Sequence, residues 1–216
     1  MKNNINLYIL NASGKLIPYV KEIEDAFNEA VIKIIKKIPV SNVDVVVVDN
    51  PLSVIPEIGI GGHAMSANYV VVSLDHEFNN LKKTLKLNLV DTLAHELCHA
   101  VRWQAIGYPY NNLLEALITE GLADHFANEI TKTKNLQPWD KALISEQVKI
   151  FLKKVKGEYF NKNYIHHEWF FGSEKKGIPR WTGYTIGFNL VGEYLKKNPD
   201  KKPSQLHDLP AEKFIK

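Results

Sequence analysis

His95-Glu96-Leu97-Cys98-His99 is the stretch around which the rest of this sequence is organised. If the stretch is helical, His95 and His99 lie one turn apart on the same helix face and can both reach one metal ion. A catalytic zinc ion takes three protein ligands and keeps one position open, so a third ligand must come from elsewhere in the chain. Glu96 lies beside the two histidines and is the expected general base, which accepts a proton from the attacking water.

The residues around this motif favour a helix. Apolar side chains recur at helical spacing, at Val90, Leu93, Leu97 and Val101. We expect the helix to begin near Asn88, which can cap it, and to end before Gly107. His95 and His99 fall off the apolar stripe, whereas Cys98 lies on its side and is expected to be a small buried hydrophobe.

A second helical pattern follows, over residues 113–130. It holds Glu120 and Asp124 four residues apart, and therefore on one helix face. About twenty residues separate His99 from Glu120, which is enough for the first helix to end, turn and give way to the second. The two motifs therefore lie on consecutive helices.

H-E-x-x-H followed about twenty residues later by E-x-x-x-D resembles the gluzincin metallopeptidases, the thermolysin-like group. Three blocks together resemble more closely the YjaZ-like predicted zinc-dependent proteases: TLAHELCHAVRW at 92–103, EALITEGLADHFA at 115–127 and RWTGYTIGFNLVGEYL at 180–195. The glycine-rich stretch 59–64 extends the likeness upstream. The resemblance implies a zinc site and hydrolysis, without naming a substrate.

This resemblance implies roles for the second motif. Glu120 corresponds to the third zinc ligand, and Asp124 to the acceptor that orients a ligand histidine. Glu115 is the competing carboxylate, but only Glu120 stands in the E-x-x-x-D frame. His125 is an alternative ligand, which would make the site all-histidine. The expected cofactor is one Zn²⁺ per chain.

Hydrolysis of an amide also needs a donor that stabilises the oxyanion of the tetrahedral intermediate. Tyr184 is the candidate, although a tyrosine near the start of a helix commonly serves packing alone. His166, His167 and Arg180 are the alternatives.

The stretch 59–64 has two possible interpretations. As in gluzincins, Gly61 and Gly62 can belong to an edge strand that binds an extended substrate through main-chain hydrogen bonds. The alternative is a glycine-rich turn between two strands.

The remaining pattern predicts an α+β fold of the zincin type. Strands are expected at 5–10, 43–49 and 69–74, and further helices at 15–38, 145–155 and 182–197. We expect one domain over residues 1–216, with a small mixed sheet and the active-site helix in an N-terminal lobe (about 1–110) packed against a mainly helical lobe (about 111–216).

Composition narrows the possible partners. The net charge is only +3 and the lysines are spread along helix ends, so we expect no nucleic-acid partner. A single cysteine fits a reducing compartment, and without a long apolar segment we expect a cytoplasmic protein with no membrane partner.

The predicted function is hydrolysis of peptide bonds by a zinc-dependent peptidase, with a peptide or a protein as substrate. One alternative is a hydrolase of non-peptide amides. Another is an inactive zincin-like protein that acts as a binding or regulatory module. The sequence leaves the oligomeric state open.

Overall fold

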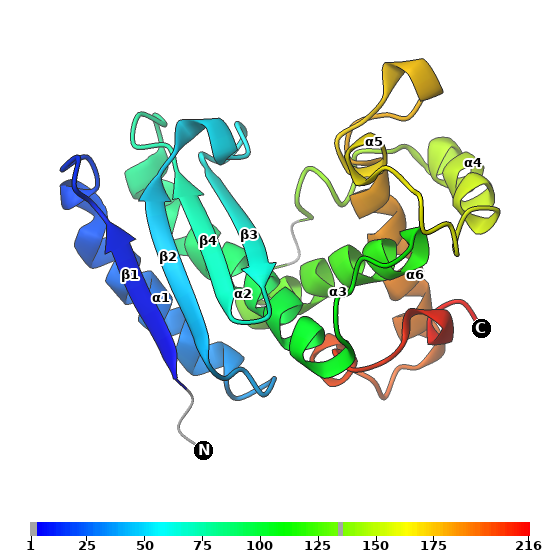
Figure 1. The fold of residues 1–216 in the computed structure, drawn as a ribbon, viewed down its shortest axis with the longest axis horizontal. Coiled ribbons are helices and arrows are strands. Elements are labelled where there is room, and N and C mark those ends of the chain that lie inside the picture. Colours follow the sequence, from blue (N-terminus) through cyan, green and yellow to red (C-terminus); the bar gives the residue numbers. More distant parts are fainter. Residues whose placement is uncertain (1–3, 134–135) are drawn as a thin grey trace. The chain divides into compact units, whose positions relative to one another are not determined.

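The computed structural model describes residues 4–133 and 136–216, and the chain forms two compact units (Figure 1). Unit 1 comprises Met1–Gln104 with Phe126–Lys132, and unit 2 comprises Ala105–His125 with Thr133–Lys216. The fold is mixed α+β, with a small mixed sheet in the N-terminal part of the chain and mainly helices in the C-terminal part. This confirms the predicted fold class.

Unit 1 contains a four-stranded sheet with the strand order β1-β2-β4-β3. The strands are β1 (Ile5–Leu10), β2 (Val43–Asp49), β3 (Ile60–Ser66) and β4 (Tyr69–Leu74). β1, β2 and β4 are parallel, and each matches a predicted strand. β3 runs antiparallel to β4 and lies at the edge of the sheet. The glycine-rich stretch is therefore part of an edge strand.

One face of the sheet is buried beneath helices. Alternate residues of the two central strands are fully or almost fully buried: Val43, Val45 and Val47 in β2, and Val70, Val72 and Leu74 in β4. Because successive side chains of a strand point to opposite faces, these six share one face. Helices α1 (Val20–Ile34) and α2 (Leu81–Ile106) lie behind the sheet in Figure 1, and α1 buries its apolar stripe.

Helix α1 is shorter than the predicted helix over residues 15–38. The chain first makes a 3-10 turn at Ile17–Tyr19, and the α-helix extends over Val20–Ile34. At its end the N–H of Lys37 donates to the carbonyl three residues back, at 2.8 Å. This tightened turn precedes Pro39, which disfavours helical geometry in the residue before it.

Helix α2 begins seven residues earlier than predicted, at Leu81 rather than at Asn88. Its buried stripe continues upstream through Leu81, Leu85 and Leu89, which are spaced one turn apart. Asn88 lies inside the helix, and its side-chain N–H donates to the carbonyl of Ile58 at 3.4 Å. The residue interpreted as a cap therefore ties α2 to the segment before β3.

Most of unit 2 is helical. Its helices are α3 (Leu113–Thr131), α4 (Ser145–Lys156), α5 (His166–Phe170) and α6 (Thr182–Lys197). Only the part of α3 up to His125 belongs to this unit. Helices α3, α4 and α6 confirm the predicted helices within one residue at each end. The aromatic-rich stretch 160–177 contains the short helix α5.

Helices α3 and α6 cross at two glycines. A Cβ atom at Gly121 would lie 2.2 Å from the carbonyl carbon of Gly187, and one at Gly187 would lie 2.1 Å from the carbonyl oxygen of Leu117. The two backbones are therefore in direct contact, which only residues without side chains allow. The crossing lies at Gly121, directly after Glu120, the predicted third ligand. It therefore holds this part of α3 against α6.

Replacing Gly187 by Ala is expected to lower the free energy of unfolding by about 1–3 kcal/mol, the usual cost of overpacking. The added methyl group would meet backbone, which cannot move aside as a flexible side chain can. Gly157→Ala is the matched control, because its Cβ would have an ordinary contact of 3.6 Å with the carbonyl oxygen of Lys154. Urea denaturation of both variants measures the difference; equal stabilities would contradict the close crossing.

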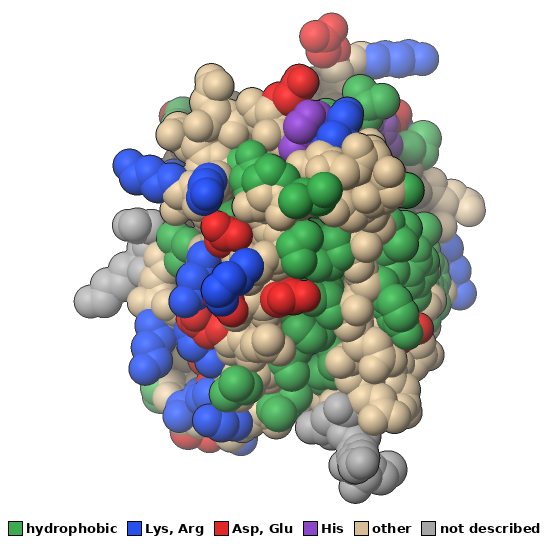
Figure 2. All heavy atoms as spheres, turned by 90° about the vertical axis from the view of Figure 1, so that its left-hand side faces the viewer, with side chains coloured by type: hydrophobic (Ala, Val, Ile, Leu, Met, Phe, Trp, Pro, Cys, Tyr) green, Lys and Arg blue, Asp and Glu red, His purple; other side chains and the backbone are tan. Residues whose placement is uncertain are grey.

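Figure 2 shows one face of the molecule, on which basic and acidic side chains are interleaved. Over α1, Lys21 pairs with Asp25 at 2.7 Å, and Glu29 pairs with both Lys33 at 2.7 Å and Lys86 at 2.8 Å.

No helix in the described parts of the chain has both the length and the apolar character needed to cross a bilayer.

Candidate metal centre

Helix α2 carries the H-E-x-x-H motif. The rings of His95 and His99 are in edge-to-face contact, with their centroids 4.5 Å apart. His99 is only 4% exposed and Glu96 only 6%, whereas His95 is half-buried. The i, i+4 spacing thus places two imidazoles together, in a position largely shielded from bulk water.

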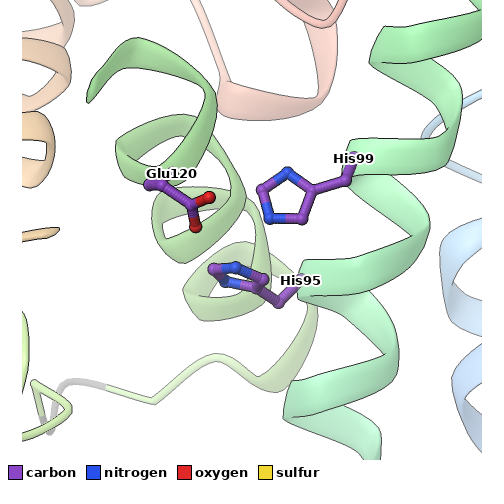
Figure 3. A group of neighbouring side chains, drawn as sticks. All are labelled: His95, His99 and Glu120. Atoms are coloured by element: carbon purple, nitrogen blue, oxygen red, sulfur yellow. The ribbon is translucent and has the colours of Figure 1, made fainter. Parts of the chain in front are cut away.

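Glu120 of α3 joins the two histidines. One nitrogen of His95, one nitrogen of His99 and a carboxylate oxygen of Glu120 all lie within 4.8 Å of one another (Figure 3). Among the described residues, these three side chains form the group whose ligand atoms lie close enough together to hold one metal ion. Glu120 is 5% exposed. That these three residues bind zinc stays a prediction.

The donor set fits zinc. Two neutral imidazoles and one carboxylate are a ligand combination that catalytic zinc sites use. Zinc binds such nitrogen and oxygen atoms at about 2.0–2.2 Å. Three protein ligands also leave the fourth position open, as a catalytic site requires.

The alternative ligand His125 has a different environment. Its Nε2 atom lies 2.9 Å from the carbonyl oxygen of Phe188, and its ring stacks on the Phe188 ring with the centroids 4.0 Å apart. Burial lowers the pKa of His125, although the Phe188 carbonyl and Asp124 act in the opposite direction. We therefore assign His125 to the contact between α3 and α6. The competing Glu115 accepts a bond from the N–H of Ala211 at 3.4 Å.

Tyr110 is a site residue that the sequence did not reveal. Its hydroxyl donates to Oε1 of Glu120 at 2.9 Å and thereby holds the carboxylate in one orientation. Tyr164 in turn donates its hydroxyl to the carbonyl of Tyr110 at 3.4 Å. Burial raises the pKa of Tyr164, so this hydroxyl stays protonated and remains a donor. Tyr110 precedes α3 in a loop, where no helical spacing relates it to Glu120.

Tyr110→Phe is expected to weaken zinc binding by about 10–100-fold, the usual cost of losing a partner that orients a ligand. The ring remains, so the loop keeps its packing while Glu120 loses a hydrogen bond. Competition with a chromogenic chelator measures the affinity. Tyr8→Phe, which alters an exposed tyrosine of β1, is the control. Wild-type affinity in Tyr110→Phe would show that this hydroxyl does not support the site.

Asp124 is buried at 4% exposure, one helical turn after Glu120. Its Oδ1 atom accepts a hydrogen bond from the indole N–H of Trp139 at 3.1 Å. The Thr185 hydroxyl in turn donates a hydrogen bond to the main-chain carbonyl of Trp139 at 2.6 Å, which helps to hold Trp139 in place. No local sequence pattern predicts these two partners. That Asp124 orients a ligand histidine stays a prediction.

Tyr184, the predicted oxyanion donor, lies among aromatic side chains of unit 2. Its ring contacts Phe170 edge-to-face at 5.1 Å and Phe171 at 6.5 Å. The alternative donor His166 stacks on Phe170 at 4.2 Å and also contacts Tyr110, at 5.7 Å. Both candidates thus belong to one aromatic cluster, and the role of Tyr184 stays a prediction.

The two glycines predicted to bind substrate lie in the edge strand β3. Gly61 is buried against the carbonyl of Ser53, whereas Gly62 is exposed and lies beside Glu96. The edge position leaves one side of β3 without a partner strand among the described residues, apart from an isolated bridge between Ile55 and Ile60. That this side pairs with a peptide stays a prediction.

Comparisons with known proteins agree with these features. The sequence profile of a family described as "Predicted Zn-dependent protease (DUF2268)" matches residues 21–216. The chain is also 24% identical over 117 residues to the uncharacterized protein YjfC of Bacillus subtilis (strain 168). That alignment covers 49% of this chain and 39% of YjfC. No solved structure matches significantly. The profile spans far more than half of the sequence, so this chain belongs to the DUF2268 family of predicted zinc-dependent proteases.

Proposed function

We propose that this protein is a zinc-dependent peptidase that binds one zinc ion per chain and hydrolyses peptide bonds. The observation that carries the proposal is the meeting of His95, His99 and Glu120, with donor atoms within 4.8 Å of one another. Glu96, the general base that hydrolysis requires, directly follows His95. The family description supports zinc dependence and proteolysis in general terms.

The two imidazoles and the Glu120 carboxylate would hold the ion, and Tyr110 would keep that carboxylate in place through its hydroxyl. Zinc, when bound there, polarises the substrate carbonyl and lowers the pKa of a neighbouring water molecule. Both effects address the chief difficulty of amide hydrolysis, which is the attack of a weak nucleophile on an unreactive carbonyl.

Glu96 would perform the proton transfers. Its carboxylate accepts a proton from the attacking water and then donates that proton to the leaving amine nitrogen. At 6% exposure, this carboxylate is shielded from bulk water, which favours directed transfer over exchange with solvent. Tyr184 would donate a hydrogen bond to the oxyanion, with His166 as the alternative donor.

The substrate would be a peptide, or an extended segment of a protein. β3 is an edge strand, and an edge strand can add one further strand through main-chain hydrogen bonds. Because such bonds do not depend on side chains, they suit a peptide backbone better than a small amide.

Metal analysis combined with a cleavage assay tests this proposal. Elemental mass spectrometry of the purified protein should find close to one zinc ion per chain. A peptide library should then be cleaved by the zinc-loaded protein, with cleavage lost on chelation and restored by added zinc. Zinc binding with turnover of small amides alone would favour the non-peptide hydrolase. Zinc binding without any turnover would favour an inactive binding module, and failure to bind zinc would refute both kinds of enzyme.

A further inference from the structure

Gly62 is in unusually close contact with the side chain of Glu96. A Cβ atom built on Gly62 would lie 2.5 Å from both Cγ and Oε1 of Glu96, and 2.7 Å from Cγ2 of Thr92. Contacts of a real Cβ atom are essentially never shorter than 3.0 Å. The α-carbon of Gly62 therefore lies directly against the Glu96 side chain, with no room for a methyl group between them.

The need for glycine at this position comes from space and not from backbone conformation. Gly59 has a φ angle of +68°, which favours glycine, whereas Gly62 is not among the residues with positive φ. A glycine inside a strand loses side-chain packing and conformational entropy, so it usually marks a close approach by another group. At Gly62 the approaching group is the carboxylate of Glu96.

The neighbouring glycines approach other groups. A Cβ atom at Gly59 would meet the ring of Phe78 at 2.3 Å, and one at Gly61 would meet the carbonyl oxygen of Ser53 at 2.3 Å. Both contacts belong to the packing of unit 1 itself. Of these three glycines, only Gly62 touches the residue proposed as general base.

We propose that Gly62 is a positioning residue of the proposed peptidase reaction, acting through Glu96. Its bare α-carbon forms the wall against which the carboxylate of Glu96 rests. This wall limits the rotamers of Glu96 and keeps Oε1 in the orientation from which it takes the proton. The inference rests on the proposed function, because it assigns Gly62 a task in that same reaction.

A side chain at residue 62 would displace the carboxylate. β3 is held by its pairing with β4, and Glu96 is part of a long buried helix, so neither backbone can retreat easily. The Glu96 side chain has rotatable bonds and is the group that must move. A contact of 2.5 Å has to lengthen by about 1 Å to become ordinary, and misplacement by 1 Å can cost on the order of 10²-fold in rate.

The first test is kinetic. Gly62→Ala should lower kcat on the order of 10²-fold, leave KM within a few-fold of wild type and retain one zinc ion per chain. A glycine that only bound the substrate strand would instead raise KM and leave kcat nearly unchanged. Leu10→Ala, which alters an exposed residue of β1 at the opposite edge of the sheet, is the control and should behave like wild type. Wild-type kcat in Gly62→Ala would overturn the inference.

The second test does not require activity. Gly62→Ala is made in the wild-type protein and in Glu96→Ala, and the melting temperatures are compared as a double-mutant cycle. The added methyl group should cost several degrees in the presence of Glu96 and clearly less in Glu96→Ala, where only the contact with Thr92 remains. Equal losses in both backgrounds would overturn the contact. A zinc-loaded wild type that cleaves no peptide, with strong coupling in the cycle, would refute the proposed function while leaving the contact established.

Discussion

Replacing Glu96 by Gln is expected to lower kcat for peptide cleavage by about 10²–10⁴-fold, the contribution of a general base. Glutamine keeps the length and shape of the side chain, so the close contact with Gly62 is retained. It cannot accept the proton of the attacking water, although it can still form hydrogen bonds. The zinc content and the melting temperature should therefore stay at their wild-type values.

Glu24→Gln is a suitable control, since it makes the same chemical change at an exposed position of α1 and should leave kcat unaltered. Steady-state kinetics on the best substrate from the peptide library would measure both variants, each with its zinc content determined. Full activity in Glu96→Gln with zinc bound would exclude the proposed general base. A loss of zinc together with activity would instead give Glu96 a structural role.

Local patterns were sufficient to predict most of the secondary structure. The four valines of 45–48 and the run 69–74 predict buried strands because β-branched residues favour extended backbone. The start of α2 was missed because Asn88 satisfies the local rule for a helix cap, while its side chain bonds Ile58, thirty residues away in sequence. Tertiary contacts of this kind leave no local signal.

In the candidate site, too, local patterns predict some of the neighbouring residues and not others. Helical periodicity alone places His95 and His99 together, because four residues make about one turn. The prediction of Glu120 as a ligand required the family resemblance, since the sequence spacing between two helices does not select one carboxylate over another. Tyr110 could not be predicted, because a loop has no period from which to infer a contact with Glu120. The closeness of Gly62 to Glu96 likewise depends on how β3 lies on α2.

Replacing Glu120 by Ala is expected to weaken zinc binding by more than about 100-fold. Loss of a partner that only orients a ligand costs up to roughly 100-fold, and this substitution removes a ligand itself. The two histidines would remain, but two ligands do not make the three-ligand site that a catalytic zinc ion requires. Peptide cleavage should fall with zinc occupancy and recover only in part at high zinc concentration. Chelator competition and elemental mass spectrometry measure the two quantities.

Glu115→Ala distinguishes a specific ligand from a general loss of negative charge. Glu115 belongs to the same helix and is the carboxylate that competes with Glu120 in the sequence, but its Oε1 atom accepts a bond from the N–H of Ala211. We expect Glu115→Ala to bind zinc with nearly wild-type affinity while losing some stability. If both variants lost zinc equally, the charge of α3 would matter rather than the Glu120 carboxylate. If neither lost zinc, the two histidines would need a different third ligand, and the similarity to gluzincins would not extend to the metal site.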